Sequence, residues 1–83
     1  VEQIIEVEFD KEIQESLFSK LSDLKTFKNT HDKVWELTFE TEEDKRPAVF
    51  DFAQENGLRA LQLTLKNKNL EQIFREKTSK NSK

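Results

Sequence analysis

The sequence predicts a small α+β domain in which helices cover one face of a four-stranded antiparallel sheet. Three observations support this prediction. The chain has 83 residues, which is enough for one domain only. Three segments, residues 5–9, 33–41 and 59–66, alternate apolar and polar side chains with period two, which is typical of half-buried strands, and residues 24–28 are expected to form a further short strand. The segments between them repeat apolar residues every three or four positions, as helices do.

The first strand and the first helix follow from this spacing. Residues 5–9 alternate apolar side chains with Glu6 and Glu8, so we expect a strand whose acidic side faces water. Asp10 is a residue type that caps helix N-termini, because its carboxylate accepts hydrogen bonds from free amides of the first turn. A helix is predicted after it, with the apolar stripe Ile13, Leu17, Phe18 and Leu21.

A hairpin is predicted in the middle of the chain. Residues 24–28 and 33–41 are typical of strands, and residues 29–32 form a polar turn between them. Two strands joined by so short a turn must run antiparallel. The second of them alternates the apolar residues Trp35, Leu37 and Phe39 with Glu36, Thr38 and Glu40.

The second helix is expected to begin near Asp44, with Pro47 in its first turn, where a missing N–H costs nothing. Gly57 is expected to end this helix as a left-handed cap, with Leu58 folding back on the last turn. The predicted buried residues are Val49, Phe50 and Ala53, and the pattern leaves Phe52 open.

The chain is expected to close with a strand and a short helix. Residues 59–66 predict the strand, with Leu61, Leu63 and Leu65 facing inward. Asn69 and Gln72 have the spacing of a capping box. A helix of about two turns is not stable alone, so its stripe must dock on its own domain or on another domain or subunit. The candidate interface residues are therefore Leu70, Ile73 and Phe74.

The predicted order, β-α-β-β-α-β with a closing helix, is that of the ferredoxin-like sandwich. We expect residues 1–78 to form a single α+β domain. Residues 79–83 contain no apolar side chain, and we expect them to be a disordered basic tail.

Composition argues against several classes of function. Without cysteine there is no thiolate metal site, no disulfide and no cysteine nucleophile. The single glycine, Gly57, cannot form a phosphate-binding loop. No apolar run is long enough to span a membrane. The lone histidine, His31, lies in the predicted turn without a nucleophile beside it, so we interpret it as a solvated residue. We expect no catalytic, cofactor-binding or metal-binding residues.

Nucleic-acid binding is the alternative that the predicted fold raises most directly, because RNA-recognition domains stack bases on the open face of such a sheet. If Trp35 and Phe39 faced water, Glu36 and Glu40 would be buried without partners, at a large cost. We therefore expect the aromatic residues in the core and no nucleic-acid partner. The open face would then carry Glu6, Glu8, Glu36 and Glu40, which we interpret as a solvated acidic face rather than a metal site.

Charge is distributed unevenly along the chain, with a net charge of −7 over residues 1–65 and +4 over residues 66–83. This indicates an acidic body followed by a basic C-terminal segment.

Three stretches resemble the C-terminal end of bacterial ABC-transporter ATP-binding subunits, closest to those associated with gliding motility. They are Arg46-Pro47-Ala48-Val49-Phe50-Asp51-Phe52-Ala53, then Glu55-Asn56-Gly57-Leu58, then Leu70-Glu71-Gln72-Ile73-Phe74-Arg75-Glu76-Lys77-Thr78. The last contains the pattern LE-x-IF-x-x-x-T, which closes many of these subunits.

The resemblance implies a non-catalytic regulatory or interaction domain of a longer ATPase, which would agree with the start at Val1 instead of methionine. ATP and magnesium would bind the parent chain, not this fragment. The implied location is the cytoplasm, peripheral to the inner membrane and without membrane insertion. The implied partners are the ATPase domain and transporter subunits, with a homodimer also possible. A stand-alone small-ligand-sensing domain of the same fold is the alternative.

Overall fold

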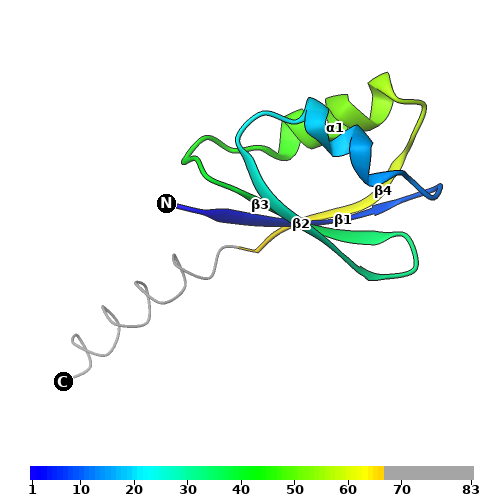
Figure 1. Ribbon diagram of the computed structural model, residues 1–83, viewed down its shortest axis with the longest axis horizontal. Helices are drawn as coiled ribbons and strands as arrows, with labels where there is room; N and C mark the ends of the chain where they lie inside the picture. The colour runs from blue at the N-terminus through cyan, green and yellow to red at the C-terminus, as the bar shows by residue number, and fades with distance from the viewer. Residues whose placement is uncertain (67–83) are drawn as a thin grey trace.

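The computed structural model describes residues 1–66, which form an open four-stranded antiparallel sheet covered on one face by helical segments. The strands are β1 (Gln3–Phe9), β2 (Leu24–His31), β3 (Val34–Phe39) and β4 (Ala60–Lys66). The helical segments are the 3-10 helix η1 (Glu15–Lys20) and α1 (Arg46–Glu55). Figure 1 shows η1 and α1 on the same face of the sheet. The α+β class is therefore confirmed.

The strands lie in the order β2-β3-β1-β4. Each neighbouring pair is antiparallel, and β1 pairs with both β3 and β4. It follows that β1 and β2 run parallel with β3 between them, and that β3 and β4 run parallel with β1 between them. The segment that contains η1 joins the first parallel pair, and the segment that contains α1 joins the second.

The two central strands bury alternate residues, as their period-two patterns predict. Burial alternates at every position of β1, where the buried side chains include Ile5, Val7 and Phe9. Trp35, Leu37 and Phe39 of β3 are buried on the same face of the sheet. Antiparallel pairing places Val7 opposite Trp35 and Ile5 opposite Leu37, so the inward rows of the two strands form one apolar surface.

The prediction of the first helix is wrong in two respects: the type of helix and the residue that caps it. The helical residues are a single 3-10 segment, and Gln14 before it has an extended backbone. Asp10 caps no helix, because its Oδ1 accepts a hydrogen bond of 2.9 Å from the backbone N–H of Arg59. Asp10 therefore links the end of β1 to the start of β4. Phe18 and Leu21, which are three residues apart, still bury their side chains.

The second helix forms as predicted but with a different buried face. Val49, Phe52 and Ala53 are buried, whereas Phe50 is 53% exposed, so the prediction for Phe50 is wrong. Successive residues of a helix are rotated by about 100°, and the helix turns Phe50 away when Val49 and Ala53 face the sheet.

The end of α1 agrees with the prediction. Gly57 has a φ of +70°, and the backbone N–H of Leu58 donates to the carbonyl of Ala53 over 2.8 Å. Leu58 is buried against the core, so the chain folds back at the glycine cap.

Leu61 is the other wrong prediction of burial, since 58% of this residue is exposed. The register of β1 with β4 shifts at this point: Glu8 pairs with Gln62, while Phe9 pairs with Ala60. Leu61 is thus the extra residue of a β-bulge, and bulges interrupt the regular alternation of side chains. Leu63 and Leu65, beyond the bulge, pack against the core.

The predicted closing helix with Leu70, Ile73 and Phe74, and the predicted tail at 79–83, lie outside the described residues. No helix within residues 1–66 is both long and apolar enough to cross a membrane.

Candidate interaction surfaces

The aromatic residues of the sheet lie beneath the helices. Trp35 is only 7% exposed, and its ring lies 4.9 Å from that of Phe18 in an edge-on arrangement. Phe18 in turn stacks on Phe52 of α1 at 5.7 Å. These rings join η1, β3 and α1 into one core, which agrees with the orientation predicted from the alternation with glutamates.

The opposite face of the sheet is open and carries carboxylates at its centre. Glu6 of β1 lies directly opposite Glu36 of β3, and both are half-buried. Two like charges in this position repel each other. Lys66 of β4 reduces that repulsion, because its Nζ lies 3.8 Å from Glu6 Oε1 and 3.8 Å from Glu36 Oε2. The acidic pair is therefore bridged by one cation from the edge strand.

Glu40 does not join these carboxylates. It follows the end of β3, and its Oε2 lies 3.7 Å from Lys25 Nζ, which also pairs with Glu2. The hydrogen bond from Lys25 lowers the pKa of Glu2 below its ordinary value. Within residues 1–66, no three acidic or histidine side chains are placed to share a metal ion.

His31 is the last residue of β2, not a residue of the turn, so β2 is longer than predicted. Its exposed ring lies beside the hydroxyl of Thr30, with Nδ1 3.3 Å from Oγ1.

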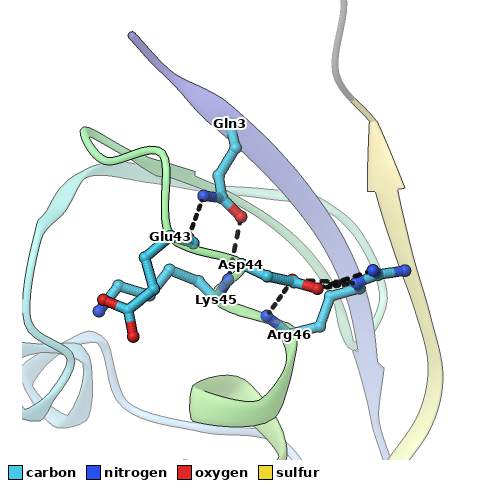
Figure 2. A network of polar contacts seen from close by, with 5 residues as sticks. All are labelled: Gln3, Glu43, Asp44, Lys45 and Arg46. Atoms are coloured by element: carbon cyan, nitrogen blue, oxygen red, sulfur yellow. Dashed lines mark hydrogen bonds and ion pairs between the residues drawn. The ribbon is translucent and has the colours of Figure 1, made fainter.

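A buried polar contact joins the start of β1 to the segment that leads into α1. The Gln3 side chain is on the inward row of β1, and the residue is 5% exposed. Its amide nitrogen donates to the carbonyls of Thr41, at 3.0 Å, and Glu43. Its carbonyl oxygen accepts from the backbone N–H of Lys45 over 3.1 Å. Figure 2 shows Gln3 pointing from β1 into this segment.

Lys45 is also buried, with 5% of its surface exposed. Its Nζ lies 3.1 Å from Asp23 Oδ2 and 3.3 Å from Ser22 Oγ. Asp23 has a φ of +66°, in the left-handed region. The ammonium thus has a carboxylate and a hydroxyl as partners, which offsets the cost of its burial.

Asp44 and Arg46, the first residue of α1, form an exposed ion pair at the start of this helix, also visible in Figure 2. Arg46 donates through Nη2 at 2.7 Å and through Nε at 3.0 Å, and its backbone N–H donates to the same carboxylate at 3.0 Å. The hydrogen bonds from Arg46 lower the pKa of Asp44 from 3.8 to about 2.

An open groove of about 650 Å³ lies between α1 and the start of β4. Its apolar side chains include the two exposed residues Phe50 and Leu61, with Leu63 beside them. Its remaining lining residues are Asp44, Arg46, Pro47, Asp51, Ala60 and Gln62. The groove joins the most exposed apolar residue of α1 to that of β4, so it is the described surface best suited to an apolar contact.

The structure therefore reveals surfaces that the sequence did not indicate. The groove forms because Phe50 and Leu61 are both turned outward, against their predicted orientations. Gln3 occupies an inward position of β1, because it lies two residues before Ile5 and four before Val7 on the same side of the strand. This spacing was the only feature of the sequence that indicated its burial. The predicted interface residues Leu70, Ile73 and Phe74 belong to the part of the chain that the structure does not describe.

Comparison with protein-family models, with curated proteins and with solved structures finds no match to this chain.

Proposed function

We propose that this chain is a non-catalytic interaction domain at the C-terminal end of an ABC-transporter ATP-binding subunit, acting through protein–protein contacts. The observation that carries the proposal is the resemblance of residues 46–53, 55–58 and 70–78 to the ends of such subunits. The first two of these stretches correspond to α1 and its glycine cap, so the resemblance follows the boundaries of a structural element.

The proposal includes a ferredoxin-like fold. Two features support it: each helical segment connects two parallel strands, and a third strand lies between the members of each pair. A split βαβ arrangement that is used twice would have this connectivity. In such a fold one sheet face and two strand edges are free of helices and are available for contacts with other proteins.

The surfaces described above support a role in binding rather than in chemistry. The half-buried carboxylates Glu6 and Glu36 of the open face are bridged by Lys66, and the exposed Phe50 and Leu61 line the groove between α1 and β4. An ATPase subunit would supply the nucleotide and magnesium sites from its own domain. Residues 1–66 would provide the surface that contacts the parent subunit, the transporter or a second subunit.

The sharpest test is the coding sequence immediately before Val1 in the source gene. We expect it to encode, in frame, an ATPase domain with a Walker A loop, a signature sequence and a Walker B strand. A stop codon in frame, or an initiator codon a few positions before Val1 that starts the natural protein, would overturn the proposal.

A functional test uses the parent subunit. Substitution of Phe74 by Lys is expected to change the rate of ATP hydrolysis measured with the assembled transporter. The matched control, Ser79→Lys, adds the same charge outside the predicted stripe and is expected to leave the rate unchanged. Equal rates for the parent and both variants would contradict a role for the closing segment in coupling.

A further inference from the structure

The two edge strands of the sheet differ in how they are protected against pairing with another strand. An edge strand presents free N–H and C=O groups, and natural proteins blunt such edges with charged side chains, proline or bulges. The edge strand β2 has two such devices. Its register with β3 shifts twice along its length, and it carries Lys28 on an exposed position.

The edge strand β4 lacks this protection over most of its length. Its single register shift is at Leu61, near its start. The five residues after the bulge, Gln62 to Lys66, pair regularly with β1 and contain no proline or glycine. Their only charge is Lys66, and its ammonium is directed over the sheet toward Glu6 and Glu36. Among residues 1–66, no strand lies on the outer side of β4.

We propose that β4 pairs antiparallel with β4 of a second copy of this chain, so that two sheets join into one. The register that uses all five regular residues has its two-fold axis at Thr64. Thr64 then lies opposite Thr64 of the second copy, Leu63 opposite Leu65, and Gln62 opposite Lys66. A symmetric contact of this kind uses the same surface on both chains and closes after two copies.

The side chains of β4 are self-complementary in this register. Leu63 and Leu65 lie on the helix-covered side of β4, so the pairing adds two leucine–leucine contacts to the apolar layer. Thr64 and Gln62 are exposed on the open face, where threonine–threonine and glutamine–lysine pairs are compatible. No like charges face each other along the strand.

The groove between α1 and β4 lies at the end of this contact. Leu63 lines the groove, and in the proposed dimer it also contacts Leu65 of the second copy. Lys66 of the second copy lies opposite Gln62, another lining residue. The apolar surface of Phe50 and Leu61 is thereby continuous with the contact between the strands.

The test is the mass of the full chain in solution, measured by sedimentation equilibrium from about 10 μM to about 1 mM, the range of weak to moderate affinities. We expect a monomer–dimer equilibrium within this range. Thr64→Lys places two ammonium groups opposite each other at the axis, and we expect it to raise the dissociation constant by about tenfold or more. Because Thr64 is exposed, this variant should fold as the parent chain does, which circular dichroism checks.

Thr26→Lys is the matched control. It adds the same charge to an exposed threonine of the other edge strand, β2, and is expected to leave the dissociation constant unchanged. A monomer at about 1 mM would overturn the proposal. A dimer that survives Thr64→Lys, or that is lost equally in both variants, would also overturn it.

Cross-linking tests the register, because the chain has no cysteine of its own. Opposite residues of an antiparallel pair have Cα atoms about 4.5–5.5 Å apart, within the range of a disulfide. Thr64→Cys is therefore expected to form a covalent dimer on mild oxidation, and Thr26→Cys is not. Cross-linking of Thr26→Cys alone would place the contact on β2 and contradict the proposal. None of these outcomes depends on which parent protein the coding sequence reveals.

Discussion

Gln3 accepts a hydrogen bond of 3.1 Å from the backbone N–H of Lys45, a residue 42 positions further along the chain. The same side chain donates to the carbonyls of Thr41 and Glu43, so one amide group serves three backbone partners. The contact fixes the segment between β3 and α1 against the start of β1. It thereby positions the residue that immediately precedes α1.

Substitution of Gln3 by Met should destabilise the domain, because it keeps the volume but leaves the buried backbone N–H of Lys45 and two part-buried carbonyls without their partner. One buried unpaired group costs about 1–3 kcal/mol, so we expect the free energy of unfolding to fall by about 2–4 kcal/mol. Urea unfolding measures this change. The matched control is Gln62→Met on the exposed row of β4, with an expected effect within about 0.5 kcal/mol. Equal effects of the two substitutions would contradict the role of Gln3.

The two neighbouring phenylalanines of α1 should differ in their importance for stability. Phe52 is 4% exposed and contacts Phe18 and Phe9, whereas Phe50 is 53% exposed. We expect Phe52→Ala to lower the free energy of unfolding by about 3–5 kcal/mol. Phe50→Ala should lower it by less than about 1 kcal/mol. Thermal unfolding of both variants decides this, and a larger loss for Phe50→Ala would contradict the helix orientation described here.

The ion pair of Asp44 with Arg46 should contribute to stability in a pH-dependent way. The folded-state pKa of Asp44 is lowered from 3.8 to about 2. A lowered carboxyl pKa contributes stability above the unfolded value, and this contribution is lost as the pH falls from about 4 through about 2. Nuclear magnetic resonance titration should therefore find the Asp44 carboxyl titrating near pH 2. In Arg46→Gln the midpoint should move toward the ordinary value, and an unchanged midpoint would show that Arg46 is not the cause.

Trp35 provides a direct optical test of the core, because the chain has one tryptophan and no tyrosine. Since Trp35 is 7% exposed, we expect acrylamide to quench its fluorescence much less in the native chain than in urea. Addition of single-stranded RNA should leave the emission unchanged, because the ring does not lie on the open face of the sheet. Strong quenching of the native chain by either reagent would contradict this orientation and would favour a base-stacking surface.

Much of the sheet could be predicted because strand alternation is a local property. Residues two positions apart in β1 must lie on the same face of the sheet, whatever the rest of the chain does. Glu6 and Glu8 therefore identified the wet side of β1, and the inward Val7 followed from them. The glycine cap at Gly57 was predictable for a similar reason, since a left-handed backbone is a property of one residue.

The candidate surfaces depended on contacts between residues far apart in the chain. Phe50 and Phe52 are both apolar and only two positions apart. The sequence of this short helix is therefore compatible with burial of either side chain. Packing against Phe9 and Phe18 selects Phe52. Leu61 is turned outward by a bulge that exists only because β4 pairs with β1. Asp10 caps no helix because its carboxylate accepts a hydrogen bond from the backbone N–H of Arg59, the residue before β4.

From the amino-acid order alone, one can thus derive the strands, the buried rows of the two central strands β1 and β3, and the α+β class, because each follows from spacing over a few residues. The tertiary structure decides the orientation of α1, the bulge at Leu61 and the strand that remains at the outer edge. These features arise from packing and strand pairing between segments that are distant in the sequence. A pattern over a few residues does not determine the energies of those contacts.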